Sequence, residues 1–222
     1  MSLKDLNKED KPFSILASLD PSFTSTGLAI LNLETKTIYT RAIKVGCPDK
    51  SFDGMQKSIS DIIDILKSEF DKFKVNALVH EQPFPGQMFS PALYGLDSVI
   101  NHTFKDIIIH TYHPTILRKI HGFKYKKKDS KELALKAITE LDDYVYINNA
   151  VENKHEKKDL FGNKLARNGD YSITSDESEA LLYAFTTCIA YKIPYFIKLS
   201  DMIHSDSKGV IDWISKKEVI ST

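Results

Sequence analysis

The sequence predicts an α/β fold with a mixed five-stranded sheet, in which three antiparallel strands precede parallel ones and helices flank the sheet. Three short apolar segments with brief connections lie within residues 13–45, which favours an antiparallel meander. From residue 55 onward, segments with helical spacing alternate with short apolar runs, which favours parallel strands joined by right-handed crossovers. The composition, 42% hydrophobic and 27% charged, excludes a disordered or fibrous chain.

The elements follow in order along the chain. Residues 13–19 (FSILASL) are an apolar run that stops at Asp20-Pro21, as a buried strand ends at a turn. Residues 26–33 and 37–45 are rich in β-branched and aromatic side chains, which favour strands. Helical spacing then predicts an amphipathic helix over 55–73. The later elements expected are strands over 75–79 and 107–111, and helices over 90–104, 131–141 and 174–191.

We expect one domain over residues 1–222, with its core at about 13–191. Residues 148–171 are a polar insertion, the kind of long loop that is usually functional or mobile, and 192–222 form a C-terminal extension. No apolar run reaches the roughly 18–20 residues of a membrane span, and the first twelve residues are too polar for a secretory signal. With only two widely spaced cysteines, we expect a cytoplasmic protein with reduced thiols and no membrane partner.

Acidic residues mark the ends of three predicted elements. Asp20 closes the first strand, Glu81 follows the fourth, and Asp176 and Glu179 lie three residues apart on one face of the last helix. Ligands of open α/β sheets bind at such strand ends, and hard cations such as Mg²⁺ take carboxylate oxygens. The four residues are therefore candidate ligands for two ions about 3.5–4 Å apart.

Each acidic residue also has a purely structural interpretation. Asp-Pro commonly begins a turn, and acidic residues in a first helical turn interact favourably with the helix dipole. Thr174 and Glu177 fit a capping box, so Glu177 is left outside the candidate site. This interpretation does not explain why two strands of one sheet both end on a carboxylate.

The net charge is zero, with 30 basic and 30 acidic residues, which on its face argues against a nucleic-acid-binding protein. The charge is unevenly distributed, however. Between residues 118 and 136, eight basic and two acidic side chains give a local charge of +6, enough to neutralise phosphates. The alternative is a solvated lysine-rich loop. The basic residues are Arg118, Lys119, Lys124, Lys126, Lys127, Lys128, Lys131 and Lys136.

Three motifs resemble those of the RuvC-type Holliday junction resolvases, which have the RNase H-like fold. Asp20-Pro21-Ser22 with the later Thr26-Gly27 resembles the family's Asp-Pro-Gly and Thr-Gly. Glu81-Gln82-Pro83-Phe84 resembles Glu-Gln-x-Phe, and the segment 176–181 (DESEAL) resembles Asp-x-x-Asp-Ala-Leu. Each motif is short, but the three occur in the family's order over roughly residues 13–191.

This chain departs from the family pattern at two motif positions. Ser22 replaces a glycine, and Glu179 replaces the last aspartate with a side chain longer by about one methylene, which would shift the metal position or preference. The polar insertion and the C-terminal extension resemble divergent bacteriophage members more than compact bacterial ones.

The resemblance implies a role for each matching residue. The four carboxylates would bind two Mg²⁺ ions, replaceable by Mn²⁺, with one ion activating a water and the other stabilising the leaving 3′ oxygen. Phe84 matches an aromatic that contacts bases near the exchange point of the junction, although it could equally be a turn aromatic between prolines. Lys128, six residues past Gly122, matches a lysine near the scissile phosphate and would stabilise transition-state charge.

We therefore expect a Mg²⁺-dependent endonuclease that nicks branched DNA, above all four-way Holliday junctions, as a symmetric homodimer in DNA recombination and repair. Two alternatives stay open: a flap or RNA–DNA hybrid nuclease on the same fold, and a DNA-binding module whose carboxylates are structural. An ATP-binding protein of the actin and sugar-kinase fold is disfavoured, because 222 residues are too few for its usual two domains and a second glycine-rich phosphate loop is absent.

Overall fold

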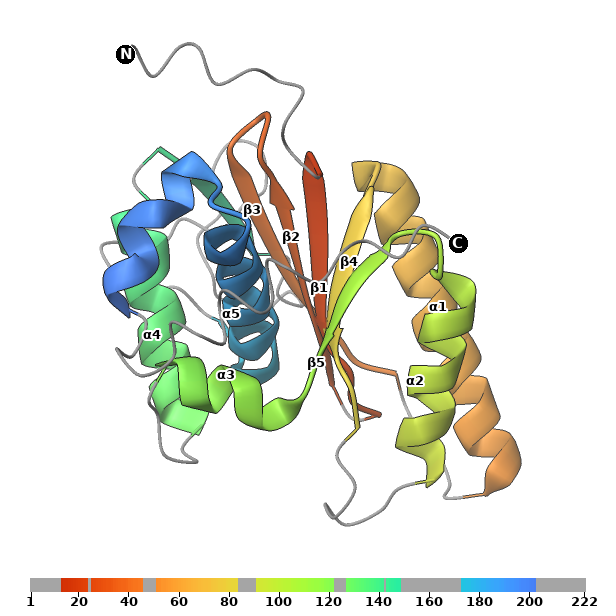
Figure 1. The fold of residues 1–222 in the computed structure, drawn as a ribbon. Helices are drawn as coiled ribbons and strands as arrows, with labels where there is room; N and C mark the ends of the chain where they lie inside the picture. The colour runs from red at the N-terminus through yellow and green to blue at the C-terminus, as the bar shows by residue number, and fades with distance from the viewer. Residues whose placement is uncertain are drawn as a thin grey trace, which may run out of the picture.

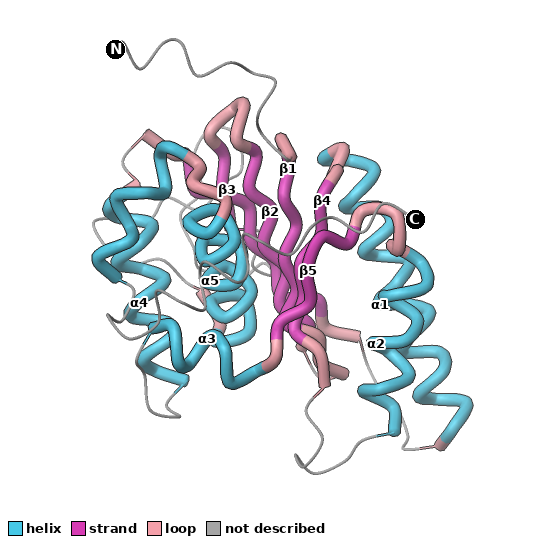
Figure 2. The backbone as a smooth tube through the Cα atoms, viewed as in Figure 1, coloured by secondary structure: helices cyan, strands magenta, loops and turns pink. Residues whose placement is uncertain are grey.

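A mixed six-stranded sheet lies between two layers of helices in the computed structural model (Figure 1, Figure 2). The structure describes residues 13–23, 25–45, 51–83, 91–121, 127–141, 143–148 and 173–202. The strands are β1 (Ile15–Asp20), β2 (Thr26–Asn32), β3 (Thr37–Ile43), β4 (Ala77–Glu81), β5 (Ile108–Tyr112) and β6 (Val145–Asn148). The helices are α1 (Phe52–Phe73), α2 (Pro91–Thr103), α3 (Pro114–His121), α4 (Lys127–Glu140), α5 (Ser175–Ala190) and the 3₁₀ helix η2 (Pro194–Met202).

The sheet has the strand order β5-β4-β1-β2-β3-β6. β1, β2 and β3 pair antiparallel, whereas β4 pairs parallel with β1 and β5 pairs parallel with β4. The predicted meander followed by parallel strands is therefore confirmed. α1 and α2 cover one face of the sheet, while α3, α4, α5 and η2 lie on the other (Figure 1).

The expectation of five strands is wrong, because β6 adds a sixth strand next to β3. β6 has four residues and pairs parallel with β3, and the Tyr146 hydroxyl lies 2.8 Å from Thr40 Oγ1. So short an apolar run, placed directly before the polar insertion, carries too little periodicity to be recognised as a strand. The insertion itself, beyond Asn148 and up to residue 172, lies outside the described residues, as does the extension after Met202.

The segment before the predicted helix at 131–141 is also more helical than expected. α3 begins at Pro114, a position where proline's fixed φ is favourable, and α4 begins at Lys127 rather than at Lys131. Part of the basic segment is thus helical, with residues 122–126 between the two helices outside the described part.

Two hydrophobic cores form because side chains alternate across each strand. In β1, Ala17 and Leu19 pack with the residues of α1 and α2, whereas Leu16 packs with those of α5. α5 is buried along almost its whole length, and its free thiol, Cys188, is fully buried, which raises the pKa of that thiol well above its ordinary value. Cys47 lies outside the described residues.

Among the described helices, none is long and apolar enough by itself to cross a membrane. The sharply bent pair of α5 and the following segment to Ser200 meets that criterion jointly, but α5 is packed inside the protein.

Candidate metal centre

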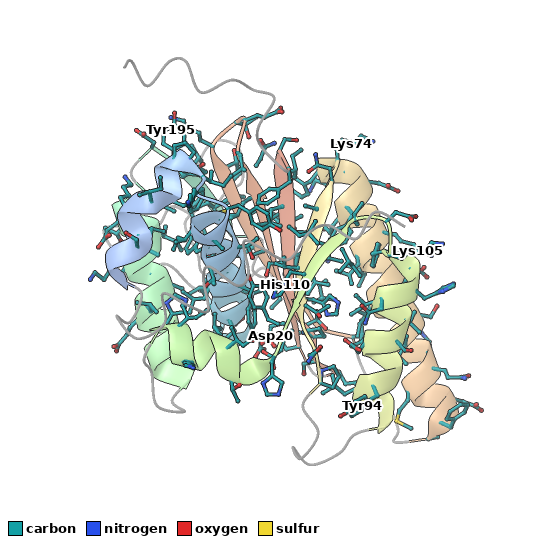
Figure 3. All side chains as sticks on the ribbon, viewed as in Figure 1. Asp20, Lys74, Tyr94, Lys105, His110 and Tyr195 are labelled. Atoms are coloured by element: carbon teal, nitrogen blue, oxygen red, sulfur yellow. The ribbon has the colours of Figure 1, made fainter. Side chains whose placement is uncertain are left out.

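Two carboxylates stand side by side where neighbouring parallel strands end. The register of β1 and β4 pairs Leu19 with His80, so Asp20 and Glu81 each come one residue later at the same edge of the sheet. Alternation along the strands sends both toward α5, because Leu16 of β1 and Val79 of β4 belong to the core on that side. Figure 3 shows Asp20 at the edge of the sheet where β1 ends.

The third carboxylate comes from α5, and a glycine lets that helix approach. Gly27 of β2 pairs with Asp20, and a Cβ added to it would lie 2.8 Å from Glu177 N and closer still to the Asp176 carbonyl group. Any residue with a side chain would therefore push the first turn of α5 away from the strands. The Thr-Gly motif at this position thus seats α5 directly beside Asp20.

The start of α5 is fixed by the predicted capping box, which is confirmed. Thr174 Oγ1 accepts a hydrogen bond from Glu177 N at 3.2 Å, and Glu177 Oε2 accepts one from Thr174 N at 2.8 Å. Glu177 is fully buried in this role. Because the first turn is held, Glu179 comes to a defined point above the strand ends.

Asp20, Glu81 and Glu179 form a compact acidic group. Each offers one carboxylate oxygen, these oxygens lie within 4.8 Å of one another, and each residue is partly exposed. Two negative charges at that distance repel by roughly 3 kcal/mol at an effective dielectric constant of about 20. Three hard oxygen donors that converge with a solvent-facing side are the ligand set that Mg²⁺ or Mn²⁺ takes, so the residues fit a divalent cation.

Asp176 lies one turn before Glu179 but is not part of this group of oxygens. It is partly buried, and Ser175 Oγ donates a hydrogen bond to its Oδ1 at 3.3 Å. Its role as a fourth ligand stays a prediction.

A tyrosine that the sequence analysis did not single out supports this group. Tyr183, one turn after Glu179 on α5, is 1% exposed, and its hydroxyl donates a hydrogen bond to Glu81 Oε2. Burial, followed by the charges of Glu81, Asp20 and Glu179, raises the pKa of Tyr183 well above its ordinary value. The phenol therefore keeps its proton and remains a donor. Its i, i+4 spacing from Glu179 is the only sequence signal for it.

The end of β4 is anchored from the other face of the sheet. His80 is fully buried there, with Nδ1 3.0 Å from the carbonyl oxygen of Glu81 and 3.6 Å from Asp97 Oδ1 of α2. Burial raises the pKa of Asp97, an effect partly opposed by His80 and by a hydrogen bond from Asn101. These contacts tie the backbone that carries Glu81 to α2.

The helix that carries the first basic residues, α3, begins at the same edge of the sheet. α3 starts two residues after Tyr112 of β5, which pairs with Glu81, and His121 Nε2 lies 3.0 Å from Thr186 Oγ1 of α5. At the usual rise of a helix, Thr186 is about 10 Å along α5 from Glu179. The end of α3 therefore contacts α5 about two helical turns from Glu179.

The structure describes the side chains of only some of the predicted DNA-contacting residues. Lys119 and Lys131 are exposed. Phe84, Lys124 and Lys126 lie outside the described residues, and so do the side chains of Arg118, Lys127 and Lys128.

Comparison with known proteins supports the fold. No protein-family model matches the chain, and no curated protein matches it by sequence. Among solved structures, Thermus thermophilus RuvC in complex with a Holliday junction substrate matches with a TM-score of 0.50 and 15% identity, over 82% of this chain and 97% of that one. A likeness at this identity shows a shared fold, the RNase H-like fold that was expected.

Two further structures match less closely. A second Thermus thermophilus RuvC structure has a TM-score of 0.47 and 16% identity over 85% of this chain and 98% of its own. The yeast mitochondrial Holliday junction resolvase Ydc2 has a TM-score of 0.40 and 12% identity over 93% of this chain and 85% of its own.

Proposed function

We propose that this protein is a metal-dependent endonuclease that cuts branched DNA, with the four-way Holliday junction as its main substrate. The observation that carries the proposal is the convergence of Asp20, Glu81 and Glu179 within 4.8 Å at one sheet edge. The fold shared with a RuvC whose structure holds a Holliday junction substrate adds support.

The chain's part in catalysis is to hold oxygen ligands in a fixed arrangement. Divalent cations, when bound, would stabilise the charge on the phosphoryl group as Lewis acids and would lower the pKa of a bound water, so that it becomes a nucleophile near neutral pH. Asp20 and Glu81 are held by paired strands, and Glu179 by a capped, buried helix. Such rigid support limits the reorganisation needed when charge develops in the transition state. Asp176 is the proposed additional ligand for a second Mg²⁺ or Mn²⁺ ion.

The basic segment is the proposed contact for the DNA backbone. Its +6 charge is carried by residues 118–136, of which Lys119 belongs to α3 and Lys131 and Lys136 belong to α4. We assign Lys128 to the scissile phosphate and Phe84 to an unstacked base, with Arg118, Lys119, Lys124, Lys126, Lys127 and Lys131 on other phosphates. When binding neutralises Z phosphates, a plot of the logarithm of the binding constant against the logarithm of the salt concentration has a slope of about −0.9Z. Because the net charge is zero, we expect moderate affinity for unbranched DNA.

A homodimer is the proposed working form. A four-way junction has approximate two-fold symmetry, and two symmetric cuts need two active sites related by the same symmetry. A symmetric dimer places one acidic group at each of the two cleaved strands.

A panel of end-labelled substrates tests the proposal. Purified protein is incubated with a four-way junction, a flap, a replication fork, an RNA–DNA hybrid and linear duplex, each with Mg²⁺, Mn²⁺ or EDTA. We expect the junction to be cut into nicked duplexes with either metal and left intact in EDTA. Preferential cutting of flaps or hybrids would contradict the proposed substrate and show that the enzyme acts on those structures instead. Absence of cleavage on every substrate with both metals would refute the nuclease and favour a binding module.

A further inference from the structure

Tyr183 lies on the buried side of the acidic group, between α5 and the sheet. It comes from the same face of α5 as Glu179, four residues on, and its hydroxyl donates to Glu81 Oε2 across the interface between helix and sheet. The ring is 1% exposed, so solvent does not compete for this hydrogen bond. The bond links the two elements that supply Glu179 and Glu81.

The ring of Tyr183 has little freedom to move. It stacks on Tyr112 of β5 with centroids 5.0 Å apart and an interplanar angle of 28°. The Tyr112 hydroxyl lies 2.6 Å from Thr187 Oγ1, which in turn donates to the Tyr183 carbonyl oxygen at 2.8 Å. The stacked ring of Tyr112, which a phenylalanine at that position would keep, thus holds the Tyr183 ring in place.

A glutamate ligand needs such a partner more than an aspartate does. Glu81 has one more rotatable bond than an aspartate, and a carboxylate ligand that is hydrogen-bonded by a neighbour presents its oxygens in a defined direction. Glu81 is partly exposed at the end of its strand, so packing alone does not lock its side chain.

We infer that Tyr183 is a positioning residue that orients the Glu81 carboxylate for binding a divalent cation. By holding Oε2, its hydroxyl fixes the orientation of the carboxylate relative to Asp20 and Glu179. This inference rests on the proposed metal-binding function and deepens it. Loss of a supporting hydrogen bond of this kind typically costs about 10–100-fold in metal affinity.

Two matched variants, Tyr183→Phe and Tyr112→Phe, test the inference. Each removes one buried phenolic hydroxyl from the same stacked pair, but the Tyr183 hydroxyl donates to the candidate ligand Glu81, whereas the Tyr112 hydroxyl lies against Thr187. Mn²⁺ binding to the full chain without DNA is measured from the loss of the free Mn²⁺ electron paramagnetic resonance signal. Thermal unfolding in EDTA reports the effect on the fold.

We expect Tyr183→Phe to bind Mn²⁺ about 10–100-fold more weakly than the wild type and Tyr112→Phe to bind it within about 3-fold. A purely structural role would lower the melting temperature of both variants and leave both Mn²⁺ affinities unchanged, and that result would overturn the inference. A wild-type chain that binds no Mn²⁺ would instead refute the proposed metal site, so the two failures are distinguishable.

A second measurement needs no change at Tyr183. In wild-type protein labelled with ¹³C at the tyrosine Cζ, titration with diamagnetic Mg²⁺ should shift the Tyr183 resonance, because its carboxylate partner becomes a metal ligand. The Tyr112 resonance, assigned with Tyr112→Phe, should stay nearly constant. A Tyr183 signal that does not move while Mg²⁺ saturates the site would contradict the inference, even if Tyr183→Phe does not fold.

Discussion

Replacing Gly27 with alanine tests the close approach that places Glu179 beside the strand ends. The added Cβ would lie 2.8 Å from Glu177 N and closer to the Asp176 carbonyl group, both of which are backbone atoms that cannot rotate away. Relief of the Glu177 N contact alone to an ordinary separation of about 3.5 Å requires α5 or β2 to move by about 0.7 Å, and the closer Asp176 carbonyl group requires a larger movement. Overpacking of this kind typically costs about 1–3 kcal/mol of stability.

The same displacement should damage the site. A shift of about 1 Å in a catalytic group can lower a rate by about 100-fold, so junction cleavage should fall much further than stability alone explains. We would measure unfolding in urea and single-turnover cleavage under conditions in which the variant is fully folded.

Gly95→Ala is the matched control. Gly95 lies inside α2, and an added Cβ would only make an ordinary 3.4 Å contact with the flexible Ile59 Cδ1. Alanine is favoured over glycine in a helix by about 0.5–1 kcal/mol, so this variant should be as stable as the wild type or more so. A Gly27→Ala variant that matches Gly95→Ala in stability and cleavage would refute the account of how α5 is seated.

Three further predictions concern stability. Thr174→Ala removes half of the capping box and should lower the free energy of unfolding in urea by about 1 kcal/mol. Thr139→Ala, on the exposed side of α4, is the control and should change it by less than about 0.5 kcal/mol. Equal losses in the two variants would contradict the capping role. Arg41→Ala leaves the buried Glu69 carboxylate without its arginine partner and should cost about 1–3 kcal/mol, against about 0–0.5 kcal/mol for Lys57→Ala in the exposed pair with Asp61. A neutral Arg41→Ala would contradict this role of Arg41 and show that Lys72, whose Nζ lies 4.0 Å from Glu69 Oε2, is a sufficient counter-charge. Burial holds the pKa values of Tyr112 and Tyr183 above the ordinary value of tyrosine. Above about pH 10 the unfolded chain therefore loses these protons while the folded chain keeps them, and the free energy of unfolding should fall as pH rises. The expected fall is up to about 1.4 kcal/mol per pH unit for each tyrosine. Urea unfolding between pH 9 and 11 should show a smaller slope for Tyr112→Phe than for the wild type, and an unchanged slope would contradict the assignment.

Local sequence patterns predicted most of the sheet, because short apolar runs that stop at turns mark strands buried on both faces, and apolar residues with a period of about 3.6 mark helices. β1, with five buried residues in a row, and α1, with its apolar stripe, carry these signals strongly. β6 and α3 do not, since four strand residues and eight helix residues each hold only about two repeats of their pattern. Both owe their structure to tertiary contacts, with β3 and α5 respectively.

The candidate site was predictable only as far as strand ends and helix spacing allow. Asp20 and Glu81 follow apolar runs, so their position at a sheet edge could be inferred. Asp176 and Glu179 share a helix face, and only the seating of α5 on Gly27 determines that Glu179 reaches the other two carboxylates. The sequence around Tyr183 indicates only an aromatic of the core, because Glu81, which accepts its hydrogen bond, is 102 residues away in the chain.

The most direct test of the central claim compares wild-type protein with Asp20→Asn on a labelled four-way junction in Mg²⁺, while a gel-shift assay in Ca²⁺ measures binding. Asparagine keeps the size of the side chain but removes the charge that holds a cation. We predict that Asp20→Asn loses cleavage by at least about 100-fold and binds the junction within a few-fold of the wild type. Normal cleavage by Asp20→Asn would contradict the assignment of Asp20, Glu81 and Glu179 as the catalytic metal site.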